Sequence, residues 1–192
     1  MSTQNRLGIV CPVGQPGREM GLQSRVTGMP NYRPEAIANE FLRRRKDSSW
    51  PRQMYIQKLS YIAHGWNLAI NGEPLTSSSP EAWDNGPVYR EIWDHVKEYG
   101  FKGPKFTLVD PSTGEPFTAH LNQSEAAVVD HVWKKYGDRS SLDLSRMTHE
   151  PNTPWFKAYF NGRNTKLNQE EIRKHYIDLA MAGREQRAEA AH

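Results

Sequence analysis

Apolar residues recur at steps of three and four over residues 52–70, a spacing typical of a helix with one broad apolar side. The stripe consists of Met54, Ile56, Leu59, Ile62, Ala63, Trp66, Leu68 and Ile70. Its width predicts a central helix that several other helices contact. The polar residues of the same stretch are expected toward the other side of the helix; they are Gln57, Lys58, His64 and Asn67. Asn71-Gly72 is predicted to end the helix, because glycine tolerates the left-handed cap conformation.

The same spacing predicts six further helices. We expect them at residues 31–47, 88–99, 122–136, 140–147, 155–160 and 168–182. Pro87 should lie near the first turn of the helix that follows it, where a missing N–H costs little. Asn122 followed by Glu125 has the spacing of a capping box, and Asn168 is expected to cap the last helix.

The pattern changes between residues 101 and 121. Residues 106–109 and 117–121 favour strands, and a turn-rich stretch of Asp, Pro, Ser and Gly separates them. We predict a small β-hairpin that packs on the helices, because two strands alone are marginally stable. The predicted fold class is therefore mainly α: a compact bundle of six or seven helices with a small β-hairpin.

Composition divides the chain into three parts. Residues 1–29 are rich in Gly, Pro, Gln and Ser and are expected to form a flexible N-terminal extension, although Leu7-Gly8-Ile9-Val10 offers an alternative of local packing. Residues 30–182 are expected to form the helical domain. The charged, Ala-rich residues 183–192 are expected to be a frayed C-terminal tail.

Charge and cysteine content narrow the function classes. The net charge is +3, from 25 basic and 22 acidic residues, which does not indicate a nucleic-acid-binding protein. The single cysteine, Cys11, fits a reducing compartment and is expected to be a spare thiol. No apolar stretch is long enough for a membrane span and none resembles a secretion signal, so we expect a cytoplasmic protein that does not contact membranes.

One basic cluster has two interpretations. It consists of Arg43, Arg44, Arg45 and Lys46 at the end of the first predicted helix. The cations suit the negative end of the helix dipole. Alternatively, they form a surface for an acidic partner.

Motifs of catalysis and metal binding are absent from the sequence. There is no phosphate-binding loop, no dinucleotide-binding glycine turn and no HExxH pair. Seven histidines are present, but none stands three or four residues from another. One cysteine rules out a zinc cluster unless histidines and carboxylates build it. His64 is more typical of a hydrogen-bonded or surface histidine than of a catalytic one. We therefore expect no catalytic residue, no metal and no cofactor, and predict that the protein is not an enzyme.

What remains is a recognition surface built from three stretches. The predicted partner-binding residues are Gln57, Lys58, Trp83, Gly86, Pro87, Thr148, His149 and Trp155. Polar residues on an apolar helix, an aromatic on a turn and a polar-aromatic loop are each typical of contact sites. Each also has a structural alternative: Lys58 pairing with a carboxylate, Trp83 in the core, and His149 capping its helix or bonding Thr153.

Three motifs in order resemble the Panacea domain family of antitoxins, which includes SocA-like and phage-associated antitoxins. They are QKLSYIAHGWNLAINGEPL at 57–75, EAW followed by GPVY at 81–89, and SLDLSRMTHEPNTPW at 141–155. The resemblance implies an antitoxin of a toxin–antitoxin system that neutralises a cognate toxin, encoded by a neighbouring gene, through direct protein–protein binding. In some relatives it implies an adapter that delivers a partner to an energy-dependent protease, which is the alternative function. Residues 52–56 depart from the family's usual small-Met-Lys-Leu pattern.

Overall fold

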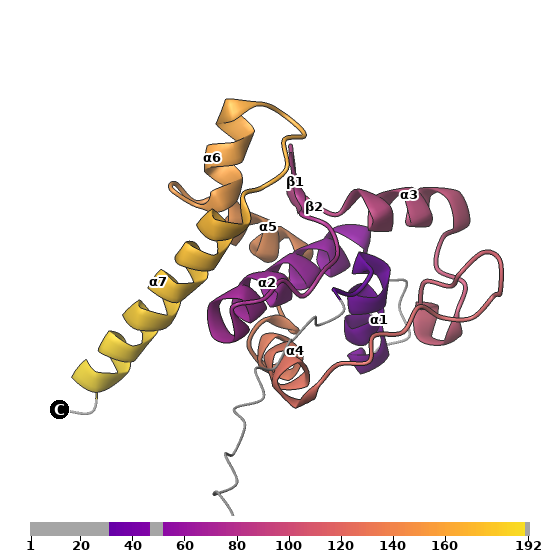
Figure 1. Ribbon diagram of the computed structural model, residues 1–192, viewed down its shortest axis with the longest axis horizontal. Coiled ribbons are helices and arrows are strands. Elements are labelled where there is room, and N and C mark those ends of the chain that lie inside the picture. The colour runs from indigo at the N-terminus through magenta and orange to yellow at the C-terminus, as the bar shows by residue number, and fades with distance from the viewer. Residues whose placement is uncertain (1–30, 47–51, 191–192) are drawn as a thin grey trace, which may run out of the picture.

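The computed structural model describes residues 31–46 and 52–190. These residues form seven α-helices, one short 3-10 helix and one two-stranded sheet, so the predicted mainly-α class is confirmed (Figure 1). In chain order the elements are α1 (Pro34–Arg44), α2 (Gln53–Asn71), β1 (Glu81–Trp83), β2 (Gly86–Val88), α3 (Arg90–Tyr99), η1 (Pro104–Phe106), α4 (Gln123–Tyr136), α5 (Ser141–His149), α6 (Pro154–Asn161) and α7 (Gln169–Glu189). The predicted extension at residues 1–29, with Cys11, lies outside the described residues.

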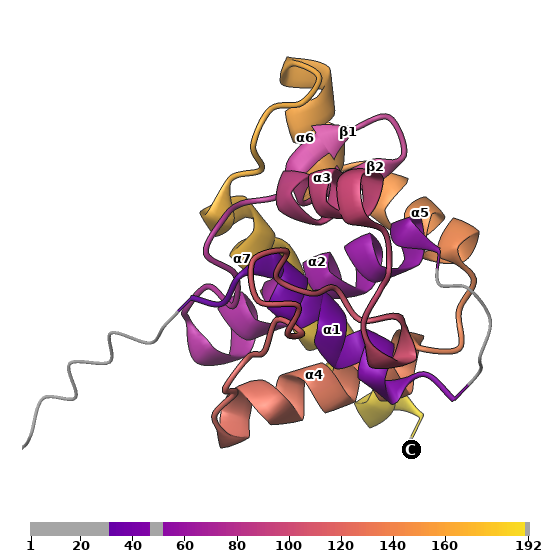
Figure 2. The same ribbon diagram turned by 90° about the vertical axis from the view of Figure 1, so that its right-hand side faces the viewer.

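Helix α2 is the centre of the fold. Figures 1 and 2 show it in the middle of the molecule, and α1, α4, α5 and α7 all pack against it. Every residue from Ile56 to Leu68 is buried. The prediction of a polar side was therefore wrong: Gln57, Lys58, His64 and Asn67 are all buried, whereas Ile70 of the predicted apolar stripe is exposed. The physical reason is that neighbours surround this helix, so its polar residues have no solvent-facing side.

Several predicted helix ends are confirmed. Gly72 has φ +75° in the left-handed region, and its N–H bonds to the carbonyl of Leu68. The side chain of Asn122 accepts from the N–H of Glu125 while the Glu125 carboxylate accepts from the N–H of Asn122, which is the expected capping box. Local hydrogen bonding alone decides these ends, which is why the sequence reveals them.

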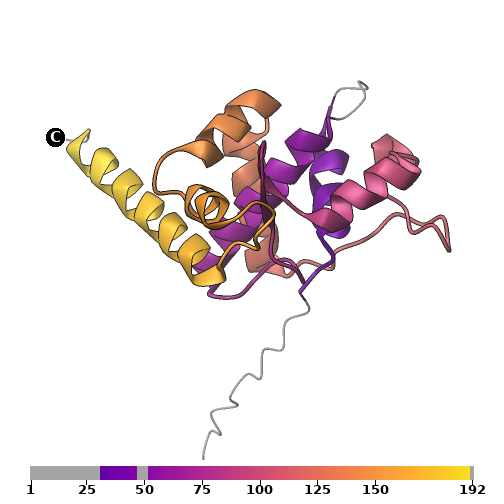
Figure 3. The same cartoon turned by 90° about the horizontal axis from the view of Figure 1, so that it is seen from above.

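Gly65 and Trp66 dock α7 onto α2. A Cβ at Gly65 would overlap the ring of Tyr176, so only glycine lets this ring approach. Trp66 is buried and meets the same ring edge-on, with centroids 5.3 Å apart. Helix α7 continues to Glu189, past its predicted end near residue 182, and its C-terminal half extends away from the body (Figures 1 and 3). In the described part of the chain, no helix is both long and apolar enough to cross a membrane.

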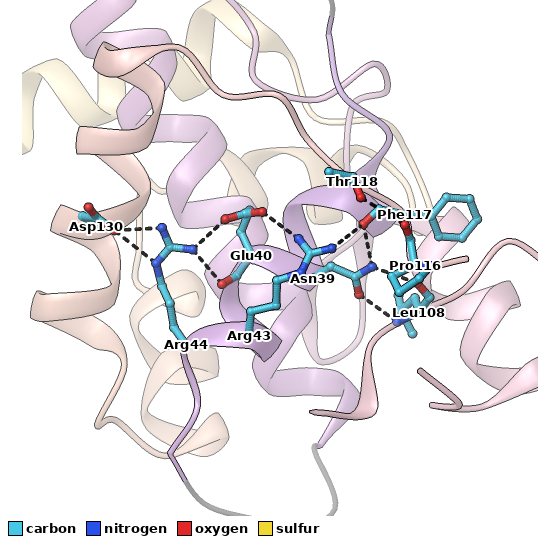
Figure 4. A network of polar contacts seen from close by, with 9 residues as sticks. All are labelled: Asn39, Glu40, Arg43, Arg44, Leu108, Pro116, Phe117, Thr118 and Asp130. Carbon is cyan, nitrogen blue, oxygen red and sulfur yellow. Dashed lines mark hydrogen bonds and ion pairs between the residues drawn. The ribbon is translucent and has the colours of Figure 1, made fainter. Parts of the chain in front are cut away.

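The predicted hairpin at 106–109 and 117–121 was wrong in position. This stretch has one isolated bridge, between Val109 and Pro116 of the predicted turn, and the two-stranded sheet lies at β1 and β2 instead. The Asn39 side chain explains the difference (Figure 4): its amide donates to the carbonyls of Leu108 and Phe117, at 2.8 Å each, and accepts from the N–H of Leu108 at 2.7 Å. The N–H of Leu108 and the carbonyl of Phe117, which would extend a ladder beyond this bridge, are thus bonded to α1, while the N–H of Phe117 still donates to the carbonyl of Leu108 at 3.1 Å.

Figure 4 also accounts for half of the basic cluster. Arg43 pairs with Glu40 at 2.8 Å and donates to the carbonyl of Phe117 at 3.1 Å. Arg44 pairs with Glu40 at 2.7 Å and with Asp130 of α4 at 2.8 Å. Both arginines lie in the last turn of α1, as the dipole interpretation requires, and their acidic partners belong to this chain.

The small sheet is anchored on both sides. Ala82 pairs with Pro87 in the antiparallel register of β1 and β2, so Pro87 is a strand residue and not part of the following helix as predicted. On its other side, β1 exchanges hydrogen bonds with residues 164–165: Asn164 donates to the carbonyl of Ala82, and Ala82 donates to Thr165, at 2.8 Å each. This arrangement fixes the turn at residues 84–85 above the N-terminal half of α2.

Candidate partner-binding site

The structure brings the predicted partner-binding residues together around the turn between β1 and β2. Helix α2 supplies Gln57 and Lys58, the hairpin supplies Trp83, Gly86 and Pro87, and the end of α5 and the start of α6 supply Thr148, His149 and Trp155. Residues from three motifs, far apart in sequence, thus form one connected group through the contacts described below. We call this group the hairpin site.

Gln57 fixes β2 to α2. Its amide donates to the carbonyl of Tyr89 at 3.0 Å and its oxygen accepts from the N–H of Tyr89 at 2.8 Å. Both polar atoms of a buried side chain are therefore satisfied by one backbone residue. This two-point contact holds the hairpin in register on the helix, so Gln57 has a structural role whatever binds above it.

Lys58 is buried without a counter-charge. Lys58 is 1% exposed, and its ammonium donates to the carbonyl of Pro87 at 2.9 Å. Among the described residues, no carboxylate lies within ion-pair distance of it, so the predicted alternative of a carboxylate partner was wrong. Burial lowers the pKa of Lys58 to about 7. An unpaired buried cation costs free energy, which makes this residue unusual in the core.

Gly86 is required by the space around Lys58. Its φ is +99°, a region that other residues rarely adopt. A Cβ here would lie 2.7 Å from the Thr148 hydroxyl and 2.8 Å from the Lys58 ammonium nitrogen. The hairpin therefore approaches α2 and α5 more closely than any side chain at this position would permit.

Trp83 is held in place on the surface. It is half-buried, so the alternative of a core position was wrong, and its indole N–H donates to Glu81 at 2.9 Å. Its ring meets Trp93 of α3 with centroids 5.2 Å apart, and the guanidinium of Arg90 lies 5.2 Å from it. Burial alone would raise the pKa of Glu81, but hydrogen bonds from Arg90 and Trp83 outweigh it and lower that pKa. The indole is thus fixed before any partner arrives.

The start of α6 and the end of α5 close the site. Trp155 donates its indole N–H to the carbonyl of Trp83 at 2.8 Å. The His149 ring packs against Trp155 with centroids 3.9 Å apart and the two planes tilted by 48°. Its nitrogens lie 2.6 Å from the carbonyl of Ser145 and 3.1 Å from that of Asp84. The contact with Ser145, four residues earlier, confirms the capping alternative for His149. Thr148 is buried beside Gly86 and donates to Ser145.

Only Trp83 and His149 among the predicted residues retain appreciable exposure. Of the buried ones, Gln57 and Lys58 line a pocket of about 330 Å³. It is lined by Gln53, Met54, Gln57, Lys58, Trp83, Asp84, Asn85, Val88, Trp93, Arg163 and Asn164. We call it the hairpin pocket.

Sequence reasoning missed much of this pocket. Trp93 belongs to none of the three stretches expected to form the recognition surface, yet it is 39% exposed and lines the pocket. Arg163 and Asn164 come from a loop that carries no motif, and Arg163 pairs with Asp84 at 3.5 Å. Arg163 and Asn164 are positioned by the pairing of residues 164–165 with β1, and no local sequence pattern predicts that pairing. Among all the residues that the structure describes, no group of three or more His, Cys, Asp or Glu is arranged to hold a metal ion.

A larger hollow of about 910 Å³ lies on another part of the surface. Its lining is basic and includes Arg45, Lys46, Arg52, Lys134 and Arg139. Lys46 and Arg52 flank the stretch at 47–51 that lies outside the described residues. The hairpin pocket is the better-defined site.

Similarity to known proteins covers the region that contains the hairpin site. The sequence profile described as "Antitoxin SocA-like, Panacea domain" matches residues 56–156, just over half of the 192-residue chain. The match spans the hairpin, α5 and Trp155 and most of α2. The chain is 27% identical over 141 residues to Antitoxin SocA of Caulobacter vibrioides (strain NA1000 / CB15N), with 69% of this chain and 72% of that protein aligned. No solved structure matches the chain at a significant level.

Proposed function

The chain belongs to the SocA-like antitoxin family with a Panacea domain, and on that premise we propose that it neutralises a cognate toxin by direct protein–protein binding. The toxin is proposed to be the product of a neighbouring gene, and both proteins to act in the cytoplasm. The observation that carries the proposal is the family match, which spans the hairpin site.

The build of the hairpin site supports binding rather than catalysis. Its side chains hold backbone groups: Gln57 bonds Tyr89, Lys58 bonds Pro87, and Trp155 bonds Trp83. Rigid aromatic side chains lose little conformational freedom on association, and tryptophan is enriched among residues that dominate binding energy. We therefore propose that Trp83 and Trp93 contact the toxin and that the protein acts without turnover.

The test begins with growth. Each neighbouring open reading frame is expressed in a heterologous host, alone and together with this chain. We expect one neighbour to arrest growth, co-expression to relieve the arrest, and the two proteins to co-purify in a fixed stoichiometry. If no neighbour arrests growth, the proposed function is wrong.

Two further arms separate mechanisms. Trp83→Ala and Trp93→Ser should weaken the complex and the rescue, whereas Leu142→Ser, at a 54% exposed residue of α5 outside the hairpin pocket, should leave both unchanged. Rescue that disappears in cells lacking an energy-dependent protease, while the complex persists, would favour delivery to that protease over neutralisation by binding alone.

A further inference from the structure

We propose that the hairpin pocket receives an aspartate or glutamate side chain of the toxin, whose carboxylate pairs with the Lys58 ammonium. This inference rests on the proposed function for the identity of the partner. It adds the chemistry by which that partner is recognised and the residue that recognises it.

The first argument is the unused hydrogen-bonding capacity of Lys58. An ammonium group has three donors, and the structure assigns one of them, to the carbonyl of Pro87 at 2.9 Å. Lys58 lines the hairpin pocket although the residue is 1% exposed, so the pocket is its route to a ligand. A neutral donor would satisfy Pro87 equally well. The positive charge is therefore a cost to the fold that a carboxylate in the pocket would offset.

The second argument is charge complementarity. The hairpin pocket is lined by two cations, Lys58 and Arg163, and by one carboxylate, Asp84. Asp84 is already engaged, since it pairs with Arg163 at 3.5 Å and accepts from the Tyr159 hydroxyl at 2.8 Å. Among residues 31–46 and 52–190, no carboxylate compensates Lys58 in this way, so the pocket favours an anion.

The third argument is size and lining. About 330 Å³ is near the lower limit of ligand cavities, which suits a side chain and its neighbour rather than a helix. Trp83, Trp93 and Val88 supply apolar and aromatic lining for the methylene stem of an acidic residue. Gly86 preserves the space beside the ammonium, because a Cβ there would lie 2.8 Å from the nitrogen.

The complex with the toxin provides the first test. Lys58→Met keeps an unbranched side chain, shorter by one heavy atom, and removes its charge. We expect the dissociation constant of the complex to rise at least about tenfold. Replacing each acidic residue of the toxin by its amide should identify one whose loss weakens the complex similarly and adds little to Lys58→Met. Leu142→Ser is the matched control. A folded Lys58→Met protein that binds as tightly as the wild type would overturn the proposal.

A small probe provides a test that needs no toxin. N-acetylglutamate α-amide and N-acetylglutamine amide differ only in carboxylate against carboxamide. In NMR titrations, the acid should shift the Trp83 indole signal, while the amide, and the acid added to Lys58→Met, should not. If Lys58→Met fails to fold, Trp93→Ser, which alters the pocket from an exposed position, takes its place. Equal shifts from acid and amide would overturn the proposal.

The two tests distinguish the two failures. Where a toxin complex forms, it decides the matter: insensitivity to Lys58→Met refutes the acidic side chain and leaves the antitoxin function intact. Where no neighbour is toxic, the proposed function is wrong and the small probe tests the pocket. A shift caused by the carboxylate alone would then still support carboxylate binding by the hairpin pocket.

Discussion

Helix α2 buries two basic side chains, His64 and Lys58, less than two turns apart, and their surroundings differ. His64 has both ring nitrogens partnered, one 2.7 Å from the amide oxygen of Gln169 and the other 2.9 Å from the Thr76 hydroxyl. Lys58 has a single hydrogen bond and no ionic partner among the described residues. The first lies against α7 and the chain after α2, whereas the second lines the hairpin pocket.

The difference separates a structural polar residue from a candidate binding residue. Burial lowers the pKa of His64 to about 4, although the hydrogen bond with Gln169 opposes the shift, so the ring is neutral near pH 7 and its own chain satisfies it. Lys58 is equally buried but keeps spare donors beside a cavity. A polar group whose hydrogen bonds its own fold satisfies contributes to stability. A polar group with unused donors beside a cavity can instead bind a partner.

The largest expected effect lies in the enclosed part of α2. Trp66→Ala should lower the free energy of unfolding by about 3–5 kcal/mol, because a buried ring packed on Tyr176 is removed. Urea denaturation followed by circular dichroism measures it. Ile70→Ala on the same helix, at a 57% exposed position, is the control and should change stability by less than about 0.5 kcal/mol. An unchanged midpoint for Trp66→Ala would mean that the ring is not part of the core.

A smaller loss is expected from His64→Ala. It leaves Thr76 and Gln169 without their shared partner, which should cost about 1–3 kcal/mol of stability. The affinity of the folded variant for the toxin should match that of the wild type, because His64 lies outside the hairpin pocket. Calorimetric titration at a temperature where the variant is folded checks this. Loss of affinity without loss of stability would reverse the roles assigned to the two residues.

The effect of Lys58 on stability should depend on pH in alkaline solution. Its pKa is lowered from 10.5 to about 7 in the fold, so between these values the unfolded chain binds more protons than the folded one. Stability should therefore rise with pH across this window, by up to about 1.4 kcal/mol per pH unit relative to Lys58→Met. Denaturation of both proteins at pH 7, 8 and 9 isolates the effect. Parallel curves would show that Lys58 is not a destabilised cation.

The smallest effect on stability is expected for Trp93→Ser. Trp93 is 39% exposed, and its main neighbour is the Trp83 ring, so the loss should be about 0.5–1.5 kcal/mol. Toxin affinity should nevertheless fall more than for Leu142→Ser, since Trp93 lines the hairpin pocket and Leu142 does not. Thermal melts and binding measured side by side make the comparison. Equal affinities for the two variants would exclude Trp93 from the interface.

Local signals were sufficient for much of this molecule. The seven helices, the Gly72 stop and the Asn122–Glu125 capping box all follow from spacing and from hydrogen bonds within a few residues. The three stretches named from the sequence also lie together in the structure as the hairpin site, although neither the contacts of their residues nor the pocket lining could be derived from the sequence. Arg163 and Trp93 reach that pocket from separate elements.

By itself, the sequence determined the helical class, most element positions and the family, because periodicity, caps and motif order are local properties of the chain. Only the tertiary structure decided which polar residues are buried and which strands pair. Lys58 was expected on a polar side of α2, yet α2 is surrounded, and Asn39 took the backbone groups that the predicted hairpin needed. Burial and pairing depend on what other segments bring, and a residue cannot specify its distant neighbours from its own surroundings in the chain.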